Sequence, residues 1–136
     1  MKKLLFALLL GTLFLSACDN DDDNAEPTNE VSVIIQQPAA NAVFSTNDAM
    51  VHVHVDAGAT VELHNVSIEI YEAGDETQKV YEASGHGSGT APYAHHADVD
   101  MANFSSGDYT IRVTACGAHM CMGDNKAIES NTFTVQ

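Results

Sequence analysis

A closely spaced pair of histidines, His52 and His54, is a place in this chain where side chains could bind a metal ion. The two histidines alternate with valines between Val51 and Val55, and alternation with period two indicates a half-buried strand. Side chains two residues apart on a strand project from one face about 7 Å apart, so two imidazoles can reach one ion. Because the valines occupy the opposite face, we expect both histidines to face outward.

A third imidazole could join this pair from another strand. His95 and His96 lie near the start of an expected strand from Tyr93 to Met101. We take this strand as the fifth of the sandwich and the strand of His52 and His54 as the second, and these two strands commonly share a sheet. His96 could then converge with His52 and His54, whereas His95 would point the other way. The alternative is a set of solvated histidines on polar sheet faces.

The segment Cys116-Gly117-Ala118-His119-Met120-Cys121-Met122 brings together two thiols, one imidazole and two thioethers. Soft ligands of this kind select Cu(I) or Zn, so His119 is a further candidate ligand, although the spacing matches no established zinc signature. The alternative is a disulfide between Cys116 and Cys121, the expected chemistry outside the cytoplasm. Such a bridge would close a six-residue loop and would shape that loop more than it stabilises the fold.

Motifs typical of enzymes are missing from the sequence. There is no Gly-x-Ser-x-Gly nucleophile elbow, no His-Glu-x-x-His zinc helix and no phosphate-binding glycine loop. Asp98 and Asp100 alternate with apolar residues, which places them outward as a solvated pair rather than as an acid and base couple. We therefore expect a protein that is not an enzyme.

Residues 31–136 have the length of one compact domain, and period-two patterns indicate that it is all-β. Turn residues separate the candidate strands, and no segment has a sustained helical period with caps. The candidate strands are Val31–Ile35, Ala42–Ser45, Val51–Val55, Val66–Ile70, Lys79–Ala83, Tyr93–Met101, Tyr109–Val113 and Ala127–Val135. About seven short strands with frequent turns predict an antiparallel β-sandwich.

The stretch from Gly107 to Ala115 resembles the penultimate strand of bacterial immunoglobulin-like and fibronectin-III-like domains. Residues 122–125 and 132–135 resemble the loop and last strand of the same module. The resemblance implies an immunoglobulin-like sandwich, in which the hydroxyl of Tyr109 hydrogen-bonds back across the corner that precedes its strand. The tryptophan of antibody domains is absent, since the chain has no Trp.

The N-terminus has the pattern of a bacterial lipoprotein signal. Lys2 and Lys3 precede an apolar run from Leu4 to Leu15, and Ser16-Ala17 supply the small residues before Cys18. The apolar run is shorter than the roughly 20 residues that a membrane-spanning helix needs. The resemblance to bacterial lipoproteins implies that residues 1–17 are removed and that Cys18 carries the lipid that anchors the protein to the membrane.

Residues 18–30 follow as an acidic tether. The segment holds no aromatic or long aliphatic side chain, so we expect it to be disordered and extended by charge repulsion. An acidic run after the lipidated cysteine also resembles the export signal of surface lipoproteins in Bacteroidota-type envelopes. In enterobacterial-type sorting, aspartate after Cys18 would instead indicate retention in the inner membrane. The acidic run favours a lipid-anchored protein of the outer membrane, exposed on the cell surface.

The strongly acidic composition limits the partners of the protein. Five Lys and Arg residues stand against 19 Asp and Glu residues, for a formal net charge of −14. Such a chain offers no electrostatic grip on a phosphate backbone, so nucleic acid is excluded as a partner, whereas cations are attracted.

The sequence therefore predicts a lipid-anchored envelope lipoprotein that acts as a noncatalytic binding module. The favoured ligand is a transition metal, Cu or Zn, with the candidate ligands His52, His54, His96 and His119. The alternative is a module of the cell surface that binds a protein or glycan partner, or has a structural role, without any metal.

Overall fold

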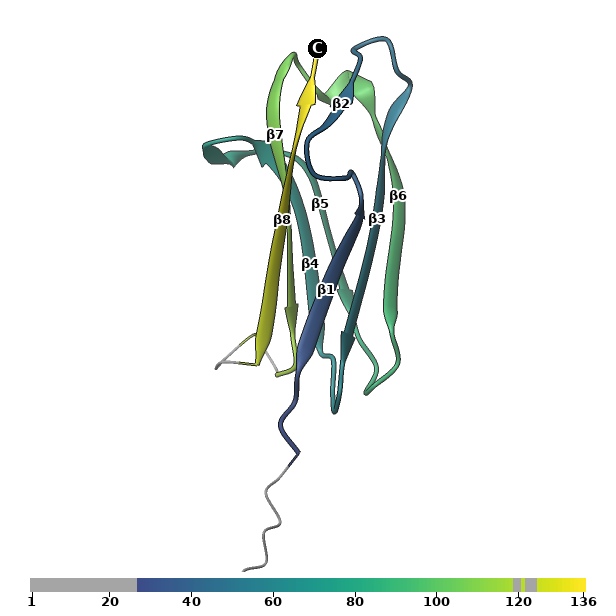
Figure 1. The fold of residues 1–136 in the computed structure, drawn as a ribbon, viewed down its shortest axis with the longest axis vertical. Helices are drawn as coiled ribbons and strands as arrows, with labels where there is room; N and C mark the ends of the chain where they lie inside the picture. Colours follow the sequence, from purple (N-terminus) through teal and green to yellow (C-terminus); the bar gives the residue numbers. More distant parts are fainter. Residues whose placement is uncertain (1–26, 119–120, 122–124) are drawn as a thin grey trace, which may run out of the picture.

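The computed structural model describes residues 27–118, 121 and 125–136, and Figure 1 shows its fold. The strands in these residues are β1 (Val31–Gln37), β2 (Ala42–Phe44), β3 (Met50–Ala59), β4 (Asn65–Glu72), β5 (Asp75–His86), β6 (Tyr93–Asp100), β7 (Gly107–Cys116) and β8 (Lys126–Val135). Outside the described residues lie the expected leader (1–17), Cys18 as the expected site of lipid attachment, residues 19–26 of the expected tether and the candidate ligand His119.

The strands form two sheets that pack face to face (Figure 1). One sheet has three strands in the order β1-β3-β6, and the other has five in the order β2-β8-β7-β4-β5. The chain passes from one sheet to the other between β1 and β2, β2 and β3, β3 and β4, β5 and β6, and β6 and β7. Such crossovers are typical of immunoglobulin-like sandwiches. The prediction of an all-β, immunoglobulin-like sandwich is confirmed.

Strand β2 departs from the expected antiparallel pairing. It lies within the candidate strand Ala42–Ser45, is three residues long, and pairs in parallel with β8. Between β1 and β2 the chain crosses from the three-stranded sheet to the five-stranded sheet and continues in the same direction (Figure 1). The crossover therefore gives a parallel pair at one edge of a sandwich whose other pairs are antiparallel.

Strand β5 is longer than the segment from Lys79 to Ala83 that the sequence predicted. Its last residues include Gly85, which lies beyond the predicted segment and pairs with Val66 of β4. A Cβ atom at Gly85 would lie 2.5 Å from Cε2 of the Tyr93 ring. Because glycine has no side chain, the ring can pack directly over the backbone here, which is a common reason for glycine within a strand.

The core lies between the two sheets and is formed by the inward side chains of alternating positions. The largest side chains that are fully buried are Tyr109, Phe133, Leu63, Ile68, Ile70, Ile111, Val51, Val53, Val55, Val66, Val113 and Val135. Phe44, Phe104, Tyr109 and Phe133 pack as a cluster of rings with centroids 5.0 to 6.1 Å apart. This alternation fixes which side chains of each strand face solvent.

The domain begins before Val31, because the end of the expected tether is bound to it. The side-chain amide of Asn29 donates to the carbonyl of Glu62, and its oxygen accepts from the backbone of Val61 and Glu62. The backbone of Glu30 donates to the hydroxyl of Thr60 and accepts from its amide. An asparagine that satisfies loop amides in this way needs no apolar contact, which is why hydrophobic patterning alone did not include it in the domain.

A 3-10 turn, η1 (Met101–Asn103), follows β6 and begins where the side chain of Asp100 accepts from the amide of Ala102. Within the described part of the chain, no helix has the length and apolar character needed to span a bilayer.

Candidate functional site

The outer surface of the three-stranded sheet gathers histidine and aspartate side chains. On β3 buried valines alternate with His52, His54 and Asp56, and on β6 the exposed positions include His96 and Asp98. We call these five residues the His/Asp face. It is placed by ordinary strand alternation, because burying the valines turns every second residue of β3 outward.

The antiparallel register between β3 and β6 sets which side chains meet on this face. His54 lies directly opposite His96, and their ring centroids are 3.9 Å apart with an angle of 36° between the ring planes. Directly opposite residues on one face of an antiparallel pair have the closest Cβ atoms of any cross-strand neighbours. The two imidazoles are therefore held side by side by the sheet itself.

His52 has a different partner. It lies opposite Asp98, and its Nδ1 atom is 2.6 Å from Oδ1 of that carboxylate. Both side chains are well exposed, at 60% and 61% of their surface. Such an exposed pair contributes little to stability, because water screens the attraction between its members.

Asp56 borders the histidine pair on the same strand. Its Oδ1 atom lies 3.6 Å from Nε2 of His54, and its Oδ2 atom accepts a hydrogen bond from the side-chain amide of Gln36 on β1. The carboxylate is thus oriented by one neighbour and placed beside an imidazole nitrogen.

The three histidines that the sequence grouped as metal ligands share one face, but only two of them touch. His54 and His96 are in contact, and His52 turns to Asp98. Among the residues that the structure describes, no group of three or more His, Cys, Asp or Glu side chains is arranged to hold a metal ion. One copy of the chain in this arrangement therefore offers a pair of imidazoles rather than a complete coordination shell.

The charges of the domain are distributed unevenly between the sheets. Strands β1, β3 and β6 contain no Lys or Arg, whereas Lys79, Arg112 and Lys126 lie on strands of the five-stranded sheet. The His/Asp face consequently has carboxylates without any fixed positive charge on its own sheet. This arrangement attracts cations to that side of the molecule.

His95 points the other way, toward the space between the sheets. Its Nε2 atom lies 2.7 Å from the hydroxyl of Tyr81 on β5, and its ring stacks on Tyr93 with centroids 6.5 Å apart. Burial, and to a lesser degree the neighbouring His96, lowers the pKa of His95 below its usual value. Burial also raises the pKa of Tyr81. Both groups are therefore neutral at neutral pH, and the phenol can donate to the imidazole.

Tyr109 occupies the corner before β7. Its hydroxyl accepts a hydrogen bond of 2.9 Å from the backbone amide of Ser105 and donates one of 3.1 Å to the carbonyl of the same residue. The side chain is 1% exposed. This is the geometry of a tyrosine corner, in which the hydroxyl ties a loop back to the start of a strand.

Cys116 and Cys121 form a disulfide, with an S–S distance of 1.99 Å and Cα atoms 5.1 Å apart. The disulfide interpretation of this segment is supported, and in this state both sulfur atoms are engaged with each other and not with a metal. Of the other candidate ligands in the segment, His119, Met120 and Met122 lie outside the described residues.

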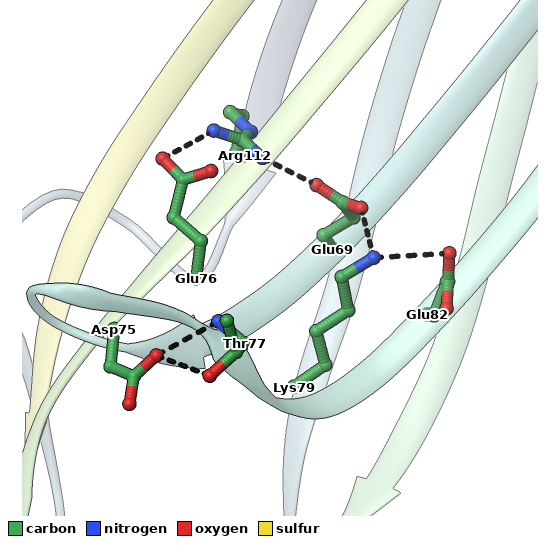
Figure 2. Close-up of polar contacts among 7 residues, drawn as sticks. All are labelled: Glu69, Asp75, Glu76, Thr77, Lys79, Glu82 and Arg112. Atoms are coloured by element: carbon green, nitrogen blue, oxygen red, sulfur yellow. Dashed lines mark hydrogen bonds and ion pairs between the residues drawn. The ribbon is translucent and has the colours of Figure 1, made fainter.

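A network of ion pairs lies on the outer surface of the five-stranded sheet (Figure 2). The carboxylate of Glu69 on β4 accepts from Lys79 of β5 at 2.5 Å and from Arg112 of β7 at 2.8 Å. These two hydrogen bonds, that of Lys79 first, lower the pKa of Glu69. Arg112 also pairs with Glu76, and Lys79 also pairs with Glu82. The network cross-links three neighbouring strands.

Sequence reasoning did not find this network. Its central residues were visible as outward positions, since Glu69 alternates with isoleucines and Arg112 lies between Ile111 and Val113. The alternation shows that these side chains share an outward orientation, but not that β4 lies between β5 and β7. That order brings Glu69 between its two cationic partners.

A small hollow of about 240 Å³ adjoins the His/Asp face. It is mainly apolar and is lined by Gln36, Gln37, Pro38, Ala39, Ala42, Phe44 and His52. The hollow is large enough for one small side chain or ligand group beside the imidazole of His52.

Comparison with solved structures shows a similar fold in the CARDB domain of a protein from Pyrococcus furiosus, crystallised in complex with di-metal ions. The TM-score is 0.50 at 11% sequence identity, and the match covers 81% of this chain and 89% of that chain. A scan against protein-family models and a search among curated proteins give no match. At this level of identity the likeness shows a shared β-sandwich fold and carries no information about ligands.

Proposed function

We propose that this protein is a lipid-anchored, noncatalytic binding module of the bacterial cell envelope. We further propose that it binds a transition metal ion, Zn(II) or Cu(II), through His54 and His96. The observation that carries the metal proposal is the direct apposition of these two imidazoles on an exposed sheet face, with centroids 3.9 Å apart. Imidazole nitrogen is a ligand that suits both metals.

The surroundings of the pair support a cation as the ligand. Asp56 lies beside His54, and the three strands of this sheet carry no Lys or Arg that would repel a metal ion. Across the whole chain the excess of acidic residues gives a net charge of −14. The same balance argues against nucleic acid as a partner.

The anchoring part of the proposal rests on the N-terminal sequence. The apolar run from Leu4 to Leu15 and the small residues before Cys18 are the features of a lipoprotein signal. We expect the protein at the outer membrane, exposed on the surface. Metabolic labelling with a palmitate analogue should label the wild type and not Cys18→Ser, and protease treatment of intact cells should digest the domain. A chain that remains unlabelled would contradict the anchor.

The metal proposal is tested by isothermal titration of the mature chain carrying Cys18→Ser, which removes the lipid. Titration with Zn(II) and Cu(II) should give saturable binding with a Kd below about 1 μM, which corresponds to roughly 8 kcal/mol. The double variant His54→Ala with His96→Ala should lose this binding while keeping the thermal unfolding midpoint of the parent, because both side chains face solvent.

His86→Ala is the matched control for the titration. This histidine lies on β5 at the edge of the other sheet, so its loss should leave the affinity unchanged. Weak binding without a stoichiometric end point would contradict the metal proposal, as would full binding by the double variant.

If metal binding fails in this test, the alternative is an interaction module for a protein or glycan partner. The apolar hollow beside His52 is the specific feature that favours it, because a small apolar group could insert there. In that case, binding should be sensitive to a substitution that fills the hollow, such as Ala39→Leu.

A further inference from the structure

The His54 and His96 pair is incomplete as a zinc site within one chain. Zinc in proteins is almost always held by four tetrahedral ligands in structural sites and by three in catalytic sites. Within the described residues no third His, Cys, Asp or Glu joins the pair in a metal-holding group. Asp56 is engaged by the amide of Gln36, and His52 is engaged by Asp98. The remaining zinc ligands would therefore have to come from another molecule.

We infer that Zn(II) joins two copies of this chain face to face, with His54 and His96 of each copy completing a four-histidine zinc site. This inference rests on the proposed metal-binding function and assigns its partner, a second copy of the chain. A twofold arrangement brings the same patch of both copies together, so a pair of ligands on one copy automatically becomes four ligands on two.

The position of the pair allows a second copy to approach. The outer face of the three-stranded sheet is covered by no other element of the described structure, since the sandwich packs on its inner face (Figure 1). Next to the pair in the register, Asp56 lies opposite Ala94, whose small side chain leaves room above the imidazoles. Ile34 of β1 is 60% exposed on the same face and would gain an apolar contact in the dimer.

Charge makes the association depend on the metal. Each copy would present Asp56 and Asp98 with no Lys or Arg on any of the three strands, so two such faces repel each other in the absence of a cation. A zinc ion between the faces supplies both the bonds and the compensating positive charge. The geometry thus points to a dimer that forms with zinc and separates when zinc is removed.

The direction of the strands is compatible with two copies anchored in one membrane. The chain enters the domain at one end of its long axis, and β1, β3 and β6 run roughly along that axis (Figure 1). A twofold axis parallel to the strands leaves the entry points of both copies at the same end. Both lipid anchors can then reach the same bilayer.

Sedimentation velocity of the mature chain carrying Cys18→Ser, with added zinc chloride or with EDTA, tests this inference. We expect a monomer in EDTA and a dimer with zinc that contains about half an equivalent of metal per chain. His54→Ala and His96→Ala should each remain monomeric in zinc. The matched control His52→Ala should still dimerise, because its side chain pairs with Asp98 rather than with the site.

The outcomes separate the dimer from the function on which it rests. A monomer that binds one zinc through the same two histidines would overturn the dimer and leave the proposed metal binding intact. Absence of zinc binding would overturn the dimer, and absence of both Zn(II) and Cu(II) binding would overturn the proposed metal binding as well. A zinc-dependent dimer that persists in both histidine variants would overturn the assignment of the ligands, and circular dichroism of each variant checks that it is folded.

Discussion

The hydroxyl of Tyr81 and the Nε2 atom of His95 meet at 2.7 Å between the two sheets of the sandwich. Tyr81 lies on β5 and His95 on β6, which are the edge strands of different sheets, so this hydrogen bond links the sheets at their edges. Removing the phenol oxygen with Tyr81→Phe should destabilise the fold by about 1 kcal/mol, the usual net contribution of such a bond. Denaturant unfolding measures this change.

A double-mutant cycle with a second substitution at His95 attributes this loss to the pair. For this cycle the substitution is His95→Leu, because a glutamine amide could itself bond the phenol. If Tyr81→Phe costs as much in the His95→Leu background as in the wild type, the two side chains are not coupled and the assigned hydrogen bond is wrong.

Acid should weaken the domain through His95. Its pKa is lowered in the folded protein, by burial above all, so the unfolded chain takes up a proton first as the pH falls below about 6.5. The contribution of His95 to the stability of the folded state is present in full above that pH. It decreases as the pH falls toward the folded-state pKa, below which the loss is complete.

The pH effect is measured as the difference in unfolding free energy between the wild type and His95→Gln from about pH 7.5 to 5. The comparison cancels the contribution of the other histidines. We expect the advantage of the wild type to shrink with falling pH; a difference that does not change with pH would show that His95 titrates alike in both states.

The fold and half of the candidate site could be read from the sequence, because both depend on local alternation. The valines around His52 and His54 predict β3 and the outward direction of both imidazoles, which the structure has. The sequence also indicated that His96 could converge with this pair, but not that it would contact His54 and leave His52 to Asp98, since that choice depends on the register between strands far apart in the sequence. The extension of β5 through Gly85 depends likewise on pairing with a different strand, since Gly85 lies opposite Val66 of β4.

Tyr109→Phe should cost about 1 to 3 kcal/mol of unfolding free energy. The substitution keeps the ring and its packing on Phe104 and Phe133, but leaves the backbone amide and carbonyl of Ser105 without their bonds to the hydroxyl. For a domain of this size, each kcal/mol corresponds to a fall of roughly 4 to 8 °C in Tm. An unchanged Tm would contradict the structural role of the hydroxyl.

Loss of the disulfide should have a moderate effect on stability. Replacing Cys116 and Cys121 by alanine opens a short loop, for which chain entropy gives about 2 kcal/mol of unfolding free energy. Reduction of the wild type should produce a similar shift in the denaturation midpoint. Detection of two free thiols in the oxidised, folded protein would contradict the bridge.

Glu69→Gln should destabilise the domain by about 1 to 2 kcal/mol, whereas Glu82→Gln should change it by less than roughly 0.5 kcal/mol. Both carboxylates contact Lys79, but Glu69 is 16% exposed and is shared with Arg112, while Glu82 is 62% exposed (Figure 2).

The pKa of Glu69 is lowered, chiefly by the hydrogen bond from Lys79. The contribution of Glu69 to stability is therefore complete above the ordinary pKa of glutamate and is lost as the pH falls through the folded-state pKa. Urea unfolding at neutral pH compares the two variants, and because urea is uncharged the ion pairs are not screened. Equal effects of both substitutions would show that the exposure of the carboxylate does not decide the strength of this network.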